Sequence, residues 1–308
     1  MSHTNQAIVT GASGLLGSQL LQNLKSQNYE TLAVFNQNPE LVSSGVKKIN
    51  CDIRDKKAVW ALKNLINPSA LIIHCAAITN VDLCEKEKEM CEAVNIGGTR
   101  NVCELARQTD SKIIYISTAS VFDGKAGNYK ETDTASPVNC YNLSKVKGEE
   151  IISSYEKGII VRVIPLGLHL SGRKPSSFLE WLVDSFRNNL DVNIFTDVKI
   201  NPLTVTTVAD MVIKAAALME SGLLHLGSRD VVSKAEVGIE VAKFFPKYKG
   251  KIHLASLEES SQNVANRPKE MWLNVDKALS LGLELPMVLP DINQYLKYFK
   301  WKKAFTYL

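Results

Sequence analysis

The most restrictive feature of the chain is its first turn, TGASGLLG at residues 10–17. Gly11, Gly14 and Gly17 follow the apolar run QAIVT and open GLLGSQLLQNL, whose apolar residues recur at helical spacing. In a strand, turn and helix of this kind, Gly11 permits the tight turn and Gly17 permits close packing of helix and strand. Gly14 would let a diphosphate reach the N–H groups of the helix N-terminus. A glycine-rich turn without a ligand is the alternative, and the residues downstream argue against it.

Apolar segments with strand character alternate with segments of helical periodicity up to about residue 165. We expect strands at 6–10, 31–35, 46–50, 70–74, 112–117 and 158–164, and helices at 14–24, 57–66, 83–108 and 141–155. This order predicts an α/β fold of Rossmann type, with a doubly wound parallel sheet and a smaller C-terminal substrate-binding region. We expect residues 1–165 to form the dinucleotide-binding core. Residues 166–308 would form mostly the substrate-binding region, with some segments returning to the core.

Charge and hydropathy exclude several classes of protein. The 308 residues carry a net charge of +4, which is too small to indicate a nucleic-acid partner but suits a small anionic ligand. The most apolar run, residues 70–78, is far too short to cross a membrane. The N-terminus lacks the basic and apolar segments of a signal peptide, so we expect a cytoplasmic protein without a membrane partner.

The cysteines and histidines do not form a metal-binding pattern. No CxxC pair occurs among the six cysteines, and several lie in apolar runs, so we expect buried free thiols in a reducing compartment. The five histidines are scattered without HxH or HxxxH spacing, so we expect no metal site.

Tyr141 and Lys145, in YNLSK, are four positions apart and would lie on one face of a helix. A phenol beside an ammonium group can titrate below its usual pKa of about 10 and act as a proton donor. Thr118 directly follows an apolar strand, at the carboxyl edge of the sheet, where folds of this type bind ligands. Tyr141 alone would by default be a half-exposed helix residue. Together with Thr118 and the glycine turn, it indicates a chemical role.

Several motifs in a fixed order resemble the extended short-chain dehydrogenase/reductase superfamily. They are TGASGLLG, CDIRD (51–55), HCAAITNVDLCE (74–85), AVN (93–95), YISTASVFDG (115–124) and YNLSKVKGE (141–149). Within the superfamily the chain looks most like dTDP-4-dehydrorhamnose reductases, and NRPKEMWLNVDKALSLGLELP at 266–286 resembles the C-terminal segment of that family. The resemblance spans nearly the whole chain.

The resemblance implies a role for each residue of the Thr-Tyr-Lys set. Tyr141 would donate a proton to a carbonyl oxygen as hydride reaches the carbon, and Thr118 would hold the same oxygen. Lys145 would lower the pKa of Tyr141 and hydrogen-bond the nicotinamide ribose. Tyr155, expected at the surface, would serve as the control for substitution of Tyr141.

The resemblance also implies a cofactor site, with Asp52 and Ile53 beside the adenine and small side chains after the fourth strand. The cofactor-binding set is Gly11, Ser13, Gly14, Leu15, Leu16, Gly17, Phe35, Asn36, Asp52, Ile53, Ala76, Ala77, Ile78, Tyr141 and Lys145. Phe35 and Asn36 end the second strand, where sites that prefer NAD often carry an acid for the ribose 2′-hydroxyl. Neither an acid nor an arginine follows, so NADP(H) is favoured and NAD(H) is the second candidate. Asn95 would brace the sheet edge or a bound water, or have only a structural role.

The substrate pocket departs from the family pattern. The expected substrate residues are Thr118, Ala119, Asn139 and Arg267. Ala119 and Ser120 replace an Asp-Tyr pair that these reductases usually carry, and Pro165 stands where the family has a tryptophan. We therefore expect a nucleotide-sugar substrate other than the usual one. Arg173 and Lys174 would either meet its diphosphate or form a solvated loop.

Three functions are compatible with the residues. The first is NAD(P)H-dependent reduction of a 4-keto-6-deoxy nucleotide sugar. The second is a sugar-nucleotide epimerase or dehydratase, although Thr118 is not followed by the acid and base that dehydration needs. The third is a non-catalytic regulatory subunit that keeps a dinucleotide site, as some relatives of the reductases do. The complete Thr-Tyr-Lys set favours catalysis, and the resemblance makes a homodimer an open expectation.

Overall fold

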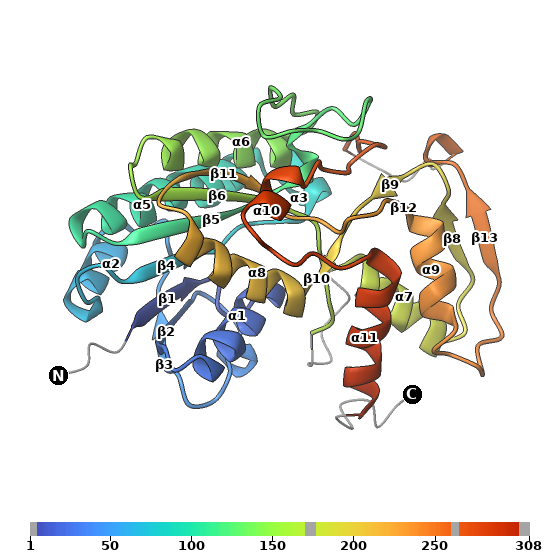
Figure 1. The fold of residues 1–308 in the computed structure, drawn as a ribbon, viewed down its shortest axis with the longest axis horizontal. Coiled ribbons are helices and arrows are strands. Elements are labelled where there is room, and N and C mark those ends of the chain that lie inside the picture. Colours follow the sequence, from blue (N-terminus) through green and yellow to red (C-terminus); the bar gives the residue numbers. More distant parts are fainter. Residues whose placement is uncertain (1–4, 170–176, 260–264, 302–308) are drawn as a thin grey trace.

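The computed structural model describes residues 5–169, 177–259 and 265–301, and a seven-stranded parallel sheet lies at its centre (Figure 1). The strands, in order across the sheet, are β11 (Gly222–His225), β6 (Gly158–Val163), β5 (Lys112–Thr118), β4 (Leu71–His74), β1 (Gln6–Thr10), β2 (Glu30–Phe35) and β3 (Lys47–Asn50). Every neighbouring pair is parallel. The expected Rossmann-type fold is therefore confirmed.

Helices cover both faces of the sheet (Figure 1). One face carries α1 (Leu15–Ser26) and α8 (Val205–Leu218), and the other carries α2 (Lys56–Ala61), α5 (Thr99–Gln108) and α6 (Cys140–Ser153). Successive side chains of a strand point to opposite faces, so Ala7 and Val9 pack against the first pair of helices and Ile8 packs against the second group. Apolar residues on both faces are what a sheet buried between two helical layers requires.

The long helical stretch expected over 83–108 is built from four consecutive elements. They are α3 (Val81–Lys86), α4 (Lys88–Glu92), the π-helical η3 (Ala93–Gly98) and α5. Gly97 and Gly98 lie in the π-helical part, where glycine weakens an ordinary helix. The interruption matters for the site because it holds Asn95 in a buried position.

After Pro165 the chain is more regular than the sequence pattern indicates. The helices here are α7 (Phe178–Arg187), α8, α9 (Lys234–Ala242), α10 (Asp276–Ser280) and α11 (Val288–Trp301). Short strands pair as β10 (Leu203–Thr204) with β7 (Pro165–Leu166), β12 (Val232–Ser233) with β9 (Lys199–Ile200), and β13 (Ile252–Ala255) with β8 (Val192–Phe195). Two of these elements lie in the core layers, because α8 packs on α1 and β11 pairs with β6. Helix α10 contacts β11, whereas α7, α9, α11, β8 and β13 lie toward one end of the molecule (Figure 1).

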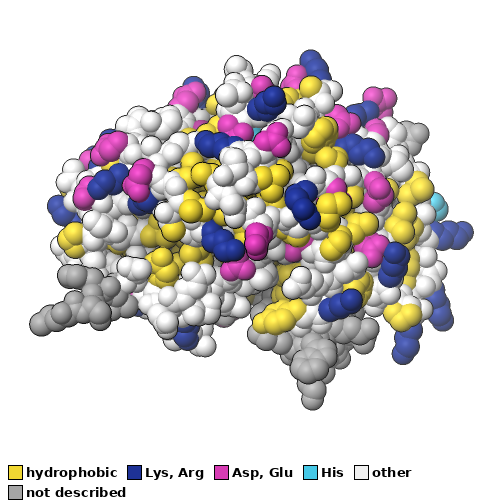
Figure 2. Space-filling model, in the orientation of Figure 1, with side chains coloured by type: hydrophobic (Ala, Val, Ile, Leu, Met, Phe, Trp, Pro, Cys, Tyr) yellow, Lys and Arg dark blue, Asp and Glu magenta, His cyan; other side chains and the backbone are white. Residues whose placement is uncertain are grey.

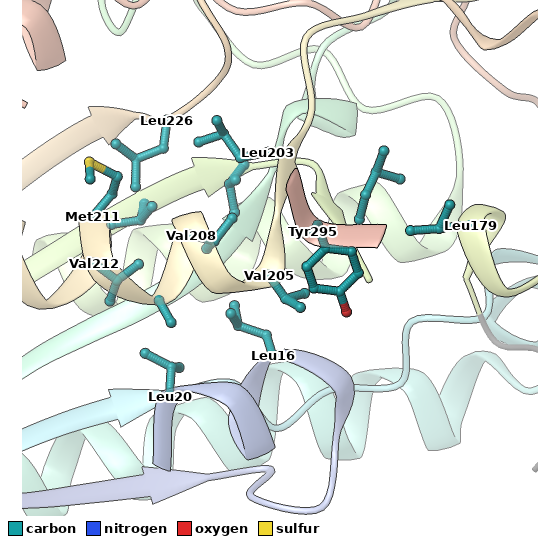
Figure 3. Close-up of a cluster of buried hydrophobic side chains, with 14 of the residues drawn as sticks. Leu16, Leu20, Leu179, Leu203, Val205, Val208, Met211, Val212, Leu226 and Tyr295 are labelled. Atoms are coloured by element: carbon teal, nitrogen blue, oxygen red, sulfur yellow. The ribbon is translucent and has the colours of Figure 1, made fainter. Parts of the chain in front are cut away.

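The largest apolar cluster joins the two ends of the sequence. Leu16 and Leu20 of α1 face Val208 and Val212 of α8, and Tyr295 of α11 lies beside them (Figure 3). Burying each such side chain stabilises the fold by about 1.5–3 kcal/mol. This packing fixes the helix that follows the glycine turn.

The charged side chains at the surface and the state of the cysteines can be compared with what the composition predicts. Lysine, arginine and acidic side chains are mixed over the face shown in Figure 2. Within the described ranges, no helix is long and apolar enough to cross a membrane, and no group of three potential metal ligands occurs. All six cysteines are free, and four of them are buried: Cys51, Cys84, Cys91 and Cys103.

Candidate active site

The glycine turn lies at the switch point of the sheet, where the strand order reverses between β1 and β4. Gly11 has a φ of +68°, and a Cβ on it would lie 2.7 Å from the backbone nitrogen of Ala76. A Cβ on Gly17 would collide with the carbonyl oxygen of Gly11, so the helix packs here against the turn itself. Gly14 precedes α1 without a capping side chain, which leaves N–H groups for an anion.

The other residues of the expected cofactor set differ in how much of each residue is exposed to a ligand. Leu16 and Phe35 are each 7% exposed and belong to the core, so little of either residue is open to a ligand. Asn36 is exposed at the end of β2. Asp52 forms an ion pair with Arg54 at 2.5 Å, and the hydrogen bonds from Arg54 hold the pKa of Asp52 below its usual range.

The segment after β4 faces the glycine turn. Residues 76–78 are half-buried, as are Ser13 and Leu15 in and after the turn. Ile53 is buried and contacts the π-helical segment at Gly98. The fold thus brings the two main parts of the expected cofactor set together, while binding itself stays a prediction.

Asn95 ties this segment to helix α6. Its Oδ1 accepts the N–H of Ile78 at 2.8 Å, and its Nδ2 donates to the carbonyl of Ile78 at 3.0 Å and to Ser144 Oγ at 2.9 Å. The residue is only 1% exposed. These contacts are those of a bracing residue, one of the roles expected for it.

Two side chains fix the start of α6. Asn139 is the N-cap, and its Oδ1 accepts the N–H of Asn142 at 2.8 Å. Glu85 of α3 accepts the N–H of Cys140 at 2.7 Å. The first N–H groups of a helix lack internal partners, so these two acceptors hold the turn that carries Tyr141.

Tyr141 and Thr118 meet at the carboxyl end of β5. Burial raises the pKa of Tyr141 well above its ordinary value, and the nearby Thr118 side chain acts in the opposite direction. Thr118 Oγ1 also accepts the N–H of Ser120 at 3.1 Å and lies 3.2 Å from Ser120 Oγ, to which it donates. Two hydroxyl groups and the phenol therefore gather at one point.

Lys145 lies one helical turn further along. Its ammonium donates to the carbonyl of Ile116 at 2.7 Å and lies 3.9 Å from the centroid of the Tyr115 ring. Burial lowers the pKa of Lys145 to about 8, and the carboxylate of Glu149 opposes that change. The expectation that the pKa of Tyr141 lies below its usual value is wrong for this arrangement. Burial of the phenol dominates, and the Ile116 carbonyl holds the ammonium.

Two further residues, Tyr155 and Ala119, are more buried than expected. Tyr155 is 3% exposed, and its hydroxyl donates to the carbonyl of Ser111 at 2.9 Å, so the expected surface position is wrong. Tyr155 follows the end of α6 and packs into the core, where it cannot serve as a neutral control. Ala119 is 1% exposed in an apolar cluster with Phe122, so it belongs to the core and not, as expected, to an open substrate pocket.

A segment from the C-terminal region reaches the start of α6. The Nη2 of Arg267 forms an ion pair with Asp82 of α3 at 2.9 Å, and the arginine side chain is 37% exposed. The Nδ2 of Asn139 donates to the carbonyl of Asn266 at 2.9 Å. Asn139 and Arg267, both expected at the substrate, thus lie on adjoining segments beside Tyr141.

Three residues of this site received no role from the sequence. Asp82 and Glu85 belong to the motif VDLCE, which supports only the resemblance, and Ser120 is known from the sequence only as a position where the pocket departs from the family pattern. Glu85 contacts Cys140, which is 55 residues further along the chain, and Ser120 contacts Thr118 through a local turn. The spacing of residues in the sequence reveals neither contact.

The remaining candidates add no residue to the site. Arg173 and Lys174 lie outside the described residues. Two surface hollows, of about 520 and about 410 Å³, have linings that contain none of the Thr-Tyr-Lys set. The lining of the first includes Leu285, and the lining of the second includes Glu150 of α6.

Comparisons with known proteins agree with this geometry. Residues 5–300 match the family model described as RmlD substrate binding domain. The chain is 26% identical to a probable low-salt glycan biosynthesis reductase of Haloferax volcanii over 292 residues, which cover 93% of this chain and 95% of the relative. It is also 26% identical to methionine adenosyltransferase 2 subunit beta of Mus musculus over 291 residues, which cover 91% and 83% of the two chains.

A solved structure resembles the whole chain. It is dTDP-4-dehydrorhamnose reductase from Bacillus anthracis in complex with NADP, with a TM-score of 0.83, 25% identity, and coverage of 96% of this chain and 99% of that one. The Rossmann fold, the glycine turn and the reductase relatives define an NAD(P)-dependent oxidoreductase. The chain belongs to the RmlD substrate binding domain family, which confirms the resemblance to dTDP-4-dehydrorhamnose reductases found in the sequence.

Proposed function

We propose that the protein uses NAD(P)H to reduce the 4-keto group of a 4-keto-6-deoxy nucleotide sugar, with Tyr141 as the proton donor. The observation that carries this proposal is the nearness of the Tyr141 side chain, in the first turn of α6, to the Thr118 side chain at the carboxyl end of β5. Two hydroxyl groups within reach of each other can hold one carbonyl oxygen between them. Lys145, on the same helix as Tyr141, supplies a buried cation.

The chemistry follows from the positions of these groups. Bound NADPH supplies the hydride for the carbonyl carbon. Thr118 donates a hydrogen bond to the carbonyl oxygen, and Tyr141 transfers its phenolic proton to that oxygen as negative charge develops. The raised pKa of Tyr141 keeps the phenol protonated at neutral pH, which a proton donor requires. The charge of Lys145 stabilises the phenolate that remains.

NADP(H) is the cofactor we favour, with NAD(H) as the second candidate. The stretch from Phe35 to Asn38 contains no carboxylate that would repel a 2′-phosphate. The NADP complex of the Bacillus anthracis reductase supports this choice. We assign the cofactor to residues 1–165 and the sugar nucleotide mostly to residues 166–308.

The substrate side of the proposal rests on the family and on Arg267. The side chain of Arg267 remains partly exposed beside the start of α6, where it can meet an anionic group. We further propose a cytoplasmic enzyme that forms a homodimer and has no nucleic-acid or membrane partner.

A regulatory subunit is the second candidate function. The observation in its favour is the similarity to methionine adenosyltransferase 2 subunit beta over 91% of this chain. A subunit that only binds a dinucleotide needs neither Thr118 nor Tyr141 as a proton-handling pair. Retention of that pair favours the reductase.

One experiment separates the two. The purified protein is mixed with NADPH and a panel of 4-keto-6-deoxy nucleotide sugars, and NADPH oxidation is followed at 340 nm (roughly the reduced-nicotinamide absorbance maximum). The reductase proposal predicts turnover with at least one sugar, at about 1 s⁻¹ or faster. Tight NADPH binding without turnover of any sugar in the panel favours the regulatory subunit.

A further inference from the structure

Glu149 lies one turn beyond Lys145 on α6, and its side chain is buried. Its Oε1 accepts hydrogen bonds from Ser117 Oγ at 2.5 Å and from Arg162 Nε at 3.0 Å. Its Oε2 accepts a third hydrogen bond from Arg162 Nη2 at 2.6 Å. Ser117 and Arg162 are buried as well. Three charge-assisted hydrogen bonds therefore fix the position of this carboxylate inside the fold.

The hydrogen bond from Ser117 connects Glu149 with the candidate active site. Ser117 directly precedes Thr118 on β5, and Glu149 belongs to the helix that carries Tyr141 and Lys145. The proposed reaction needs the hydroxyl groups of Thr118 and Tyr141 at one carbonyl oxygen. These two groups come from β5 and α6, the two elements that the Ser117 hydrogen bond joins. A shift of α6 relative to β5 would separate them.

Arg162 holds the carboxylate of Glu149 from a second strand. It lies on β6, directly opposite Ser117 in the register of the sheet. Its guanidinium donates to both oxygens of Glu149, and its Cζ lies 4.9 Å from the centroid of the Phe122 ring. A bidentate pair of this kind fixes direction as well as distance. Glu149 is therefore tied to β5 and to β6 at the same time.

The carboxylate of Glu149 also acts on the charge of Lys145. Burial lowers the pKa of Lys145 to about 8, and the negative charge of Glu149 is the largest influence that raises it. Titratable groups from other elements also act on the ammonium or lie against it: His74, Cys75, Cys91 and Tyr115. Substitution of Glu149 leaves these four groups in place, so a change in the titration of Lys145 comes from the carboxylate.

We propose that Glu149 is a positioning residue of the reduction, which keeps Tyr141 and Lys145 of α6 aligned with Thr118 of β5. It acts through Ser117 and through its charge, and it does not touch the reacting atoms. The caps at the start of α6 fix the first turn of the helix, whereas Glu149 fixes the turn beyond Lys145. The inference rests on the proposed function, because it explains how the two hydroxyl groups of that reaction stay together.

Steady-state kinetics at several pH values test the proposal, with NADPH and the best 4-keto nucleotide sugar of the panel. Glu149→Gln keeps the shape of the side chain and removes its charge. We expect kcat to fall about 10- to 100-fold, because displacement of a proton donor is costly, while KM for the sugar stays within about threefold. The pH above which kcat declines should fall by about one unit, since Lys145 loses its proton more readily without the carboxylate. A merely structural role would leave that pH unchanged.

Ser117→Ala separates alignment from charge. It removes the hydrogen bond between β5 and α6 and leaves the carboxylate of Glu149 with Arg162. We expect kcat to fall about 3- to 10-fold, without a shift in the pH of its decline. If Glu149→Gln fails to fold, Ser117→Ala decides alone. A lowered kcat in Ser117→Ala then supports the proposal, and a wild-type kcat overturns it.

Glu150→Gln is the matched control. Glu150 is the next residue of α6, but its side chain is 57% exposed and pairs with Lys147 at 3.0 Å. Its substitution removes the same charge from the same helix and should leave kcat and the pH profile unchanged. An equal shift of the pH profile in Glu150→Gln and Glu149→Gln would overturn the specific role of Glu149.

Failure of the inference differs from failure of the proposed function. Wild-type turnover together with a wild-type pH profile in Glu149→Gln overturns the role of Glu149 and leaves the reductase standing. A wild-type protein that binds NADPH but reduces no sugar of the panel contradicts the proposed function, and the inference is overturned with it.

Discussion

The carboxylate of Glu85 accepts a hydrogen bond from the backbone N–H of Cys140 at 2.7 Å, at the first residue of α6. That hydrogen bond is the main cause of a lowered pKa for Glu85, so the side chain is ionised at neutral pH. Because Tyr141 follows Cys140 directly, a residue on α3 helps to set the direction of the phenol. Glu85 thus acts on the site through the helix, without a contact to the reacting atoms.

Loss of this contact should reduce turnover more than binding. Glu85→Ala leaves the N–H of Cys140 without its acceptor, and loss of a cap of this kind costs about 1 kcal/mol of stability. We expect kcat to fall about 10-fold, because small displacements of a proton donor are costly, while the KM for NADPH changes little. Glu85→Gln retains an acceptor oxygen and should restore most of kcat. Full kcat in the alanine variant would mean that the Asn139 cap alone fixes the helix.

The cofactor site should accept NADP(H) at least as tightly as NAD(H). The neutral residues after β2 neither repel nor grip a 2′-phosphate, and calorimetry with both cofactors measures the preference. Gly14→Glu should abolish binding of both, since it puts a side chain and a negative charge where the diphosphate is expected. Even a Cβ at this position would lie 3.0 Å from the carbonyl oxygen of Gly11. A clear preference for NAD(H) contradicts the NADP(H) assignment, and normal binding by the Gly14 variant contradicts the position of the diphosphate.

The altered pocket should disfavour the usual substrate of the family. Ala119 is buried against Phe122, and Ser120 binds Thr118, so neither supplies the aromatic ring that the family usually has there. We expect poor turnover of dTDP-4-dehydrorhamnose compared with another 4-keto nucleotide sugar in the same panel. The measurement is kcat/KM for each sugar with NADPH. Rapid reduction of dTDP-4-dehydrorhamnose would show that the substitutions do not alter specificity.

Acid should destabilise the fold through His74. The ring is 1% exposed, lies 2.6 Å from Thr10 Oγ1 and 3.0 Å from Thr99 Oγ1, and burial lowers its pKa to about 3. An unfolded histidine titrates near 6.5, so the unfolded chain binds more protons between pH 6.5 and pH 3. Stability is therefore complete above about pH 6.5 and falls by about 1.4 kcal/mol per pH unit for this group as the pH drops.

Urea unfolding at several pH values tests the role of His74. His74→Gln should reduce the dependence of the unfolding free energy on pH by about one proton over this window. An equal slope in wild type and the His74 variant would show that other groups cause the acid sensitivity.

The sequence predicts the fold best where a motif and local periodicity agree. Short stretches such as Gly11 to Gly17 and Tyr141 to Lys145 predict the glycine turn, the switch point between β1 and β4, and helix α6. The resemblance also predicts the meeting of Thr118 with Tyr141, because it assigns both side chains to one carbonyl oxygen. The sequence predicts the region after Pro165 less well, since strands of two residues carry almost no periodic signal.

Other features of the site depend on burial, which spacing does not reveal. Tyr155 ends up in the core and Lys145 on the carbonyl of Ile116, although both have ordinary helical neighbours in the sequence. The pKa of Tyr141 is raised because the phenol is buried, and a lysine four residues away does not offset this.

The proposed chemistry orders the effects of substitutions in the Thr-Tyr-Lys set. Thr118→Val removes one hydrogen bond to the carbonyl oxygen and should lower kcat less than Tyr141→Phe does. Lys145→Met should lower both kcat and NADPH affinity, because it removes a charge near the phenol and the expected ribose contact. Tyr298→Phe replaces Tyr155→Phe as the control, since the side chain of Tyr298 is 53% exposed. Equal effects of all four substitutions on kcat would indicate a change of stability and not of chemistry.

The most direct test of the account is kcat of Tyr141→Phe with NADPH and the best 4-keto nucleotide sugar of the panel. Positioned proton transfer contributes about 10²- to 10⁴-fold to a rate, so kcat should fall by that factor. The dissociation constant of NADPH should remain nearly unchanged, because the phenyl ring keeps the shape of the residue. A Tyr141→Phe variant with the kcat of the wild type would contradict the assignment of Tyr141 as the proton donor.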